Sequence, residues 1–274
     1  MHDPSYYRPF TMKVFVVFAH PEPRSLTGSL LRVTVDELEA QGHEVRVSDL
    51  YAMKWKPQLD RDDFPQHPAE EPLSLTTASA AAAASDSHTE DVKREQEKLL
   101  WADAIIFQFP LWWYSMPAIL KGWVDRVFTS GFGYGLGEYN EKHWGDRYGE
   151  GRLEGKRAML IVTVGAPSQQ YSARGIAGPI EDLLFPITHG MLFYTGVAVL
   201  PSFVYWMAYR SNDEAFQAAA DELRQRLRDL PVAEPIPYRH QNAGDYEIPS
   251  LLLKPGLENS SDSGFSLHRR TVNE

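Results

Sequence analysis

Three short segments concentrate the side chains that could bind or transform a small molecule, and each of them follows an apolar run. They are His20 to Thr27 (HPEPRSLT), Pro110 to Ser115 (PLWWYS) and Gly165 to Tyr171 (GAPSQQY). The first offers hydroxyl groups and an imidazole, the second consecutive aromatic rings, and the third a glycine followed by a tyrosine. The first segment therefore suggests a site for an anion, and the second suggests a surface on which a flat ring can stack. The third suggests an exposed stretch of backbone beside a phenol.

In the first segment, Ser25 stands where it can cap a helix that runs to about Gln41. Free backbone N–H groups and the helix dipole favour an anion at such a helix start. With the Thr27 hydroxyl, Arg24 and a donating His20, the turn suits a phosphate group. A plain capped helix start explains the same residues equally well. The segment lacks both the G-x-G-x-x-G and the P-loop patterns, which disfavours a dinucleotide-binding Rossmann site and an NTPase.

The second and third segments carry the aromatic and backbone features. Trp112 to Tyr114 stand where a polar loop is expected, and consecutive rings at a strand end form a wall on which a planar ring can stack. Core or subunit-interface packing is the alternative. After Gly165 and Ala166, which allow close approach to the backbone, the Tyr171 hydroxyl can donate a hydrogen bond to charge developing on a ring carbonyl. A plain strand-to-helix turn is the alternative there.

Alternating apolar runs and helical patterns predict the elements that position these segments. Five runs are expected to be strands: Lys13 to Ala19, Glu44 to Ser48, Ala104 to Phe109, Arg157 to Val164 and Val197 to Phe203. Helices are expected between them, including one from Gly178 to Tyr194 that is interrupted at Pro186. This order predicts an α/β fold, a five-stranded parallel sheet with helices on both faces. Ligands of such sheets bind outside the carboxyl ends of the strands, so the three segments are expected to converge on one site.

Three regions lie outside this scheme. Residues 57 to 90, with four prolines and an alanine-rich tract, are expected to form a long excursion with a mobile tip. Residues 131 to 155 hold eight of the 19 glycines and predict a flexible loop that carries aromatic residues. After Pro231, prolines and sparse apolar residues predict a loop-rich C-terminal appendage with a loosely ordered end.

The amino-acid composition excludes several kinds of partner and several kinds of catalytic group. The chain has 27 Lys+Arg against 37 Asp+Glu, a formal charge of −10, which argues against binding nucleic acid or anionic membranes. It has no cysteine, which excludes disulfides, iron–sulfur clusters and thiol catalysis. The nine histidines form no H-x-x-x-H or H-E-x-x-H pattern, so no metal site is expected. A phosphate cradle, an aromatic wall and a backbone edge at one side of a parallel sheet favour a flavin as the carrier of redox chemistry.

The chain shows no sequence signal for a membrane or for export. No apolar run approaches the ~20 residues of a membrane span, and the N-terminus lacks the features of a secretory signal. A cytoplasmic protein without membrane insertion is therefore expected.

Five motifs stand out along the chain: SDLYAMKWKP (48–57), FQFPLWWYSMPAILKGWVDRVF (107–128), GFGYG (131–135), YSARGIAGPI (171–180) and FPITHGML (185–192). They closely resemble motifs of the NAD(P)H:quinone oxidoreductase (DT-diaphorase) family and its bacterial relatives, which have the flavodoxin-like fold. The likeness runs from about Lys13 to Phe203. It implies a flavodoxin-like flavin-binding domain at 12–230 and an appendage at 231–274 that makes a dimer contact and has a partly disordered end.

The resemblance also implies roles for matched residues. Those of the pyrophosphate turn are His20, Ser25, Leu26 and Thr27. Those of the isoalloxazine wall are Pro110, Leu111, Trp112, Trp113 and Tyr114. Those along the pyrimidine edge of the flavin are Thr163, Val164, Gly165 and Ala166. Tyr171 matches the tyrosine that stabilises the negative charge of the reduced flavin, and Gly165 and Trp113 join it at the reaction centre.

The implied substrate pocket departs from the family pattern. It comprises Tyr114, Tyr134, Leu136 and Ala177, with Tyr134 contributed by the other subunit, while Gln66 reaches the ribityl or ribose end of the cofactor. Mammalian members carry a histidine where this chain has Ala177, so a tyrosine–histidine proton relay is absent. Leu136 replaces a pocket tyrosine, and Ala166 replaces a glycine.

The implied activity is that of a homodimeric flavoenzyme, and several alternatives stay open. NADH or NADPH would reduce bound FAD by hydride transfer, and a quinone would then be reduced in the same pocket, a ping-pong mechanism. FMN is possible in place of FAD. The alternatives are a flavin-bearing regulatory subunit of a membrane transporter, an azo- or nitroreductase that uses FMN, and a one-electron flavodoxin carrier.

Overall fold

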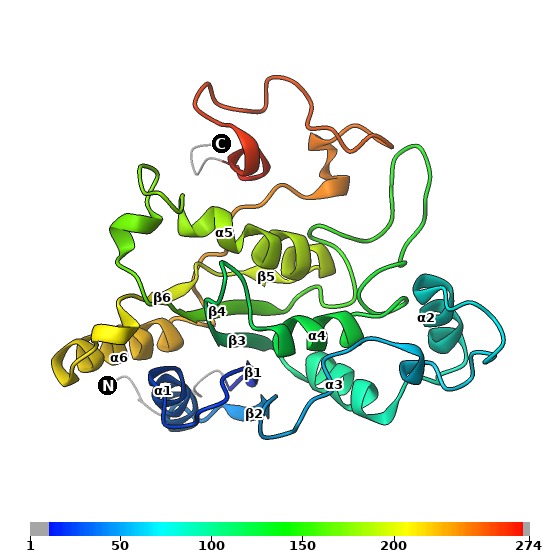
Figure 1. Ribbon diagram of the computed structural model, residues 1–274. Coiled ribbons are helices and arrows are strands. Elements are labelled where there is room, and N and C mark those ends of the chain that lie inside the picture. The colour runs from blue at the N-terminus through cyan, green and yellow to red at the C-terminus, as the bar shows by residue number, and fades with distance from the viewer. Residues whose placement is uncertain (1–10, 271–274) are drawn as a thin grey trace, which may run out of the picture.

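A parallel sheet forms the centre of the protein (Figure 1). The computed structural model describes residues 11–270, and in it the strands lie in the order β2-β1-β3-β4-β5. The four long strands are β1 (Lys13–Phe18), β2 (Glu44–Asp49), β3 (Ala104–Pro110) and β4 (Arg157–Thr163). This confirms the predicted α/β fold. In this strand order the chain reverses its winding between β1 and β3, which is the usual ligand position in such sheets.

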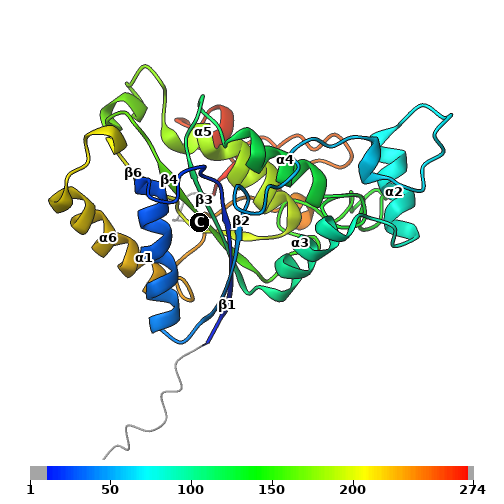
Figure 2. The same ribbon diagram turned by 60° about the horizontal axis from the view of Figure 1, so that its bottom comes forward.

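The alternation of side chains along the strands divides the core into two halves. Val14 and Val16 pack with α1 (Leu26–Ala40) and α6 (Asp213–Arg228) on one face. On the other face, residues such as Phe15 and Phe107 pack with helices α3 (Glu90–Trp101), α4 (Ala118–Val127) and α5 (Ile180–Ile187). Figure 2 shows the two groups of helices on opposite sides of the sheet. Because both faces are covered, the strands β1, β3 and β4 are mostly apolar.

The fifth strand is not the continuous run that the sequence predicts. The predicted strand over Val197 to Phe203 is broken into β5 (Ala198–Val199) and β6 (Phe203–Tyr205), and both pieces pair with β4. Pro201 lies in the break and has no N–H to donate to a strand ladder. Since β6 extends to Tyr205, it delivers the residues that follow it to the same sheet edge as the other segments.

Two further regions are more regular than predicted. The excursion between β2 and α3 contains an unpredicted helix, α2 (Leu75–Ala84), whose Ala78 and Ala82 pack against Phe64. Alanine is the strongest helix former, so the tract that suggested a mobile tip is instead helical. The interruption expected at Pro186 falls after it: α5 contains Pro186 and ends at Ile187, where a π-helical turn follows.

The C-terminal segment lies along α5, as Figure 1 shows. A short 3-10 helix, η8 (Gly264–His268), places the Phe265 ring 4.3 Å from that of Phe185. The composition of this segment did not predict that packing. Of the C-terminal end that the sequence predicts to be loosely ordered, the last four residues lie outside the described range. Within residues 11–270, no helix is both long and apolar enough to cross a membrane.

His189 occupies the contact between α5 and the C-terminal segment. Its ring stacks on Phe185 at 4.4 Å and on Tyr148 at 4.9 Å, and its Nε2 is buried without a hydrogen-bond partner. Burial, together with the neighbouring His268 and Arg269, lowers the pKa of His189 to about 3. The folded protein therefore holds this imidazole neutral.

This burial predicts a pH-dependent loss of stability. An unfolded histidine titrates near pH 6.5, so the contribution of His189 is complete above that pH. As the pH falls from about 6.5 towards 3, only the unfolded chain takes up the proton, and the free energy of unfolding falls by up to about 1.4 kcal/mol per pH unit. Urea unfolding at several pH values should show a shallower decline for His189→Phe than for the wild type. Parallel curves for the two proteins would contradict the prediction.

Candidate functional site

A cavity of about 210 Å³ lies at the carboxyl edge of the sheet, where β1, β3 and β4 end. Its walls are formed by His20, Ser25, Leu26, Thr27, Pro110, Leu111, Trp112, Thr163, Gly165, Ala208 and Tyr209. All three chemistry-bearing segments contribute, so their predicted convergence is confirmed. Ala208 and Tyr209 belong to a fourth segment, after β6, that the sequence analysis missed.

The first wall is the turn that precedes α1. The Ser25 Oγ accepts the N–H of Gly28 at 3.1 Å and caps the helix, as predicted. His20 Nδ1 lies 3.0 Å from the backbone nitrogen of Glu22 and 3.1 Å from its carbonyl oxygen, so the Glu22 backbone holds the ring in place. Arg24, however, is paired with Glu22, with 2.9 Å between its Nε and the carboxylate. This pairing lowers the pKa of Glu22 to about 2 and holds Arg24 away from the role of a free phosphate ligand.

A buried polar network forms the floor of the cavity. The Thr27 and Thr163 hydroxyl oxygens lie 2.8 Å apart, and the Gln108 side-chain amide donates to the Thr27 carbonyl at 3.0 Å. These bonds join the first turn of α1 to strands β3 and β4. Thr27 therefore ties the turn to the sheet, in addition to lining the cavity.

The second wall is a strained aromatic turn. Trp112 and Ser115 exchange two backbone hydrogen bonds of 3.0 Å, and the two residues between them have positive φ angles, 49° at Trp113 and 62° at Tyr114. Turns with this backbone normally use Asn and Gly, because side chains at positive φ clash with the backbone. Trp113 is moreover 95% exposed. Strain of this kind persists where the surrounding structure and function require it.

Tyr171 stands next to this turn. It ends the 3-10 helix η3 (Ser168–Tyr171), and its ring centroid lies 6.2 Å from Tyr114 and 5.5 Å from Trp206. Burial, and to a smaller extent Tyr114, raises the pKa of Tyr171 above its ordinary value. The phenol is thus protonated at neutral pH and able to donate a hydrogen bond.

The fourth segment closes the cavity on the β6 side. Gly165 has no room for a side chain, because a Cβ atom there would lie 2.2 Å from the ring of Tyr209. Tyr209 is itself 89% exposed. The cluster Tyr205, Trp206 and Tyr209 was the available sequence signal, but ending the predicted strand at Phe203 placed it in a loop of unknown position.

Other predicted residues lie away from the cavity lining. Val164 is buried in the core, and its N–H donates to the Tyr205 carbonyl at 2.8 Å. Tyr134 lines a separate cavity of about 550 Å³, together with Met191 and Tyr194. Gln66 is exposed in the excursion after β2. The predicted site residues that are absent from the walls of the 210 Å³ cavity are Gln66, Trp113, Tyr114, Tyr134, Leu136, Val164, Ala166, Tyr171 and Ala177.

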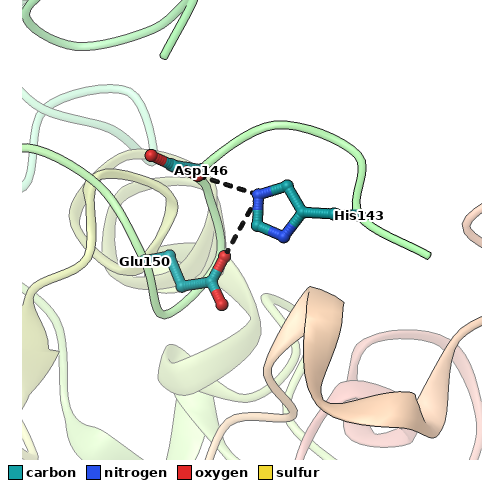
Figure 3. A group of neighbouring side chains, drawn as sticks. All are labelled: His143, Asp146 and Glu150. Atoms are coloured by element: carbon teal, nitrogen blue, oxygen red, sulfur yellow. Dashed lines mark hydrogen bonds and ion pairs between the residues drawn. The ribbon is translucent and has the colours of Figure 1, made fainter. Parts of the chain in front are cut away.

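On the loop of residues 131 to 155, one histidine and two acidic side chains of the kinds that bind metal ions lie close together (Figure 3). Their spacing in the sequence matches none of the metal-binding patterns considered above. His143 Nε2 lies 2.8 Å from Asp146 and 3.9 Å from Glu150. The Asn242 amide donates to Glu150 at 2.6 Å, which joins this loop to the C-terminal segment. None of these residues lines the 210 Å³ cavity. The contact between Asn242 and Glu150 links this cluster to the C-terminal segment.

The sequence is similar to a known protein family and to several named proteins. A family profile described as a flavodoxin-like fold matches residues 12–227. A ribosyldihydronicotinamide dehydrogenase-like protein, traD, of Penicillium crustosum is 61% identical over 95% of this chain and 96% of its own length. Human ribosyldihydronicotinamide dehydrogenase [quinone] is 38% identical over 82% of this chain and 94% of its own.

Solved structures give the same picture. A protein from Klebsiella pneumoniae, described as a suspected quinone reductase, is 54% identical with a TM-score of 0.92, covering 94% of this chain and 100% of its own. An NAD(P)H:quinone oxidoreductase from Methanothermobacter marburgensis is 27% identical with a TM-score of 0.61, covering 80% of this chain and 96% of its own.

Proposed function

Because the chain belongs to the flavodoxin-like family of NAD(P)H:quinone oxidoreductases, we propose that it reduces quinones with NADH or NADPH through a bound FAD. The observation that carries this proposal is the cavity at the winding reversal between β1 and β3, bordered by an exposed aromatic turn. A cytoplasmic location, where reduced nicotinamide nucleotides are available, is part of the same proposal.

The cavity residues fit a flavin. The capped start of α1, with His20 beside it, suits the pyrophosphate of FAD. The exposed rings of Trp112 and Trp113 offer a stacking surface for a flat ring system, and Gly165 exposes backbone at the opposite wall. A bound flavin supplies reversible acceptance of a hydride, which none of these side chains can provide.

In this proposal the protein binds the flavin, orients it and donates a hydrogen bond to it. The aromatic turn orients the flat ring system, and its apolar surface excludes water from one side. Tyr171 donates a hydrogen bond to negative charge that develops at the site. Ala177 has no side chain able to take a proton from it, so Tyr171 acts without an imidazole partner.

Replacing Tyr171 by Phe tests that assignment. We expect flavin reduction by NADPH, measured by stopped flow, to slow about tenfold, less than the 10²–10⁴ typical of acid–base groups because no relay is present. Tyr139→Phe removes a hydroxyl from the glycine-rich loop of residues 131 to 155. It is the matched control, and flavin reduction in this variant should proceed at the wild-type rate. An unchanged rate for Tyr171→Phe would remove this residue from the mechanism.

A homodimer is the second part of the proposal. Within one chain, Tyr134 lines the 550 Å³ cavity and not the 210 Å³ cavity proposed to bind the flavin. A partner subunit placed against that second cavity could present Tyr134 to the site of its neighbour, as the family resemblance implies. Sedimentation equilibrium should give twice the mass of one chain, and a monomer at working concentrations would contradict this arrangement.

Steady-state kinetics tests the activity itself. With menadione as acceptor, the purified protein should oxidise NADPH or NADH, and initial-rate plots at several quinone concentrations should be parallel. Parallel lines are expected if both substrates use one pocket in turn. Intersecting lines would contradict the shared pocket, and a flavin-loaded protein without turnover would contradict quinone reduction.

A further inference from the structure

Trp206 is one of two rings that contact Tyr171, and neither the sequence motifs nor the cavity lining points to it. The Trp206 ring lies 5.5 Å from the Tyr171 ring with 41° between their planes, closer than Tyr114 at 6.2 Å and 45°. Both Trp206 and Tyr171 are partly buried, and they pack against the half of the core that contains helices α3, α4 and α5. Tyr171 is therefore held between two aromatic side chains.

The position of Trp206 is fixed by backbone hydrogen bonds to the end of β4. The N–H of Val164 donates to the Tyr205 carbonyl at 2.8 Å, and the N–H of Ala208 donates to the Val164 carbonyl at 2.9 Å. A third bond joins the N–H of Met207 to the Ala166 carbonyl at 3.2 Å. Since these bonds lie on both sides of Trp206, its ring has a defined place relative to the segment that borders the cavity.

Tyr171, in contrast, is held through the packing of its side chain. It ends a four-residue 3-10 helix, and residues 172–174 after it are exposed. Within residues 11–270 its hydroxyl has no hydrogen-bond partner, and Ala177 offers none. The rings of Tyr114 and Trp206 are therefore contacts that restrict the direction of the phenol.

We propose that Trp206 is a positioning residue for Tyr171, and that its ring holds the phenol in the orientation from which it donates its hydrogen bond. This inference rests on the proposed function, because it concerns the same site. It adds a residue that acts through Tyr171 and does not itself carry a proton.

A double-mutant cycle tests this coupling. Trp206→Leu should slow flavin reduction by NADPH about 3- to 10-fold, the range that corresponds to losing one aromatic pair. Trp206→Phe, which retains a ring, should stay within about twofold of the wild type. In a Tyr171→Phe background, Trp206→Leu should have no further effect, because there is no hydroxyl left to position. A wild-type rate for Trp206→Leu, or an equal slowing in both backgrounds, would overturn the proposal.

A second readout needs neither flavin nor turnover. In cofactor-free protein carrying ¹³C-labelled tyrosine, the Tyr171 resonance can be identified by its loss in Tyr171→Phe and then followed with pH. Removing the Trp206 ring exposes the phenol, so in Trp206→Leu this resonance should titrate at a lower pH than in the wild type. Trp144→Leu, the same change at an aromatic pair on the glycine-rich loop, should leave the titration unchanged.

The two readouts separate failure of this inference from failure of the proposed function. An unchanged Tyr171 titration in Trp206→Leu would overturn the positioning role, whatever the protein catalyses. A wild-type protein whose flavin is not reduced by NADPH would overturn the proposed function, while the titration still reports on the contact between the two rings.

Discussion

Replacing Trp113 by Asn and Tyr114 by Gly in one protein should make the fold more stable and at the same time weaken flavin binding. Both residues sit at positive φ, where side chains other than glycine cost about 1–2 kcal/mol each, and Asn-Gly is the pair that such two-residue turns prefer. We expect the free energy of unfolding, measured in urea without flavin, to rise by about 1–2 kcal/mol. Loss of two stacking rings should lower flavin affinity about tenfold or more, measured by fluorescence quenching.

A left-handed residue elsewhere in the chain provides the control. Lys54 has a φ of 51° in the turn after β2 and does not line the cavity. Lys54→Gly should raise stability by a smaller amount without changing flavin affinity. If the Trp113→Asn, Tyr114→Gly protein binds flavin as tightly as the wild type, the aromatic turn is not the stacking surface, and its strain has another cause.

Replacing Gly28 by Ala should distort the wall of the cavity that the turn before α1 forms. Gly28 lies in the first turn of α1, and a Cβ atom there would stand 2.2 Å from the Pro23 carbonyl oxygen. The turn from His20 to Ser25 must therefore move away from the helix. We expect unfolding to become easier by about 1–3 kcal/mol, as for other overpacked sites. Affinity for FAD should fall at least tenfold, because the displaced turn carries the predicted phosphate donors.

Gly122 distinguishes a local effect from a general loss of stability. A Cβ atom at Gly122, in α4, would lie 2.0 Å from the Pro57 carbonyl oxygen, which is a clash of the same kind at a place outside the cavity. Gly122→Ala should therefore lose comparable stability and retain wild-type affinity for FAD at a temperature where it is folded. Equal loss of affinity in both variants would show that the turn before α1 has no specific role.

The sheet and the convergence of the three segments could be predicted because they depend on strong, local signals. The strands β1, β3 and β4 are covered on both faces, so their sequences are continuous apolar runs with clear ends. The rule that ligands bind at the carboxyl ends of such strands then brings His20, Pro110 and Gly165 together without any knowledge of the loops.

The missed features depend on contacts that one sequence does not reveal. Trp206 and Tyr209 reach the site because the edge strand resumes after the break at Pro201, and three isolated residues of β6 give a weak signal. The pairing of Arg24 with Glu22 was missed for a different reason: two neighbouring side chains can pair with each other or serve a ligand, and only their geometry decides. The place of Tyr134 in a second cavity likewise depends on how a long glycine-rich loop folds.

If a flavin binds at the carboxyl edge of this sheet, the purified protein should contain it, and the flavin content can be measured directly. The protein should be denatured and the released cofactor separated by chromatography, after reconstitution with FAD and, separately, with FMN. We predict one FAD per chain, with Gly28→Ala retaining much less under the same conditions. A protein that holds neither flavin after reconstitution would show that this edge of the sheet is not a flavin site.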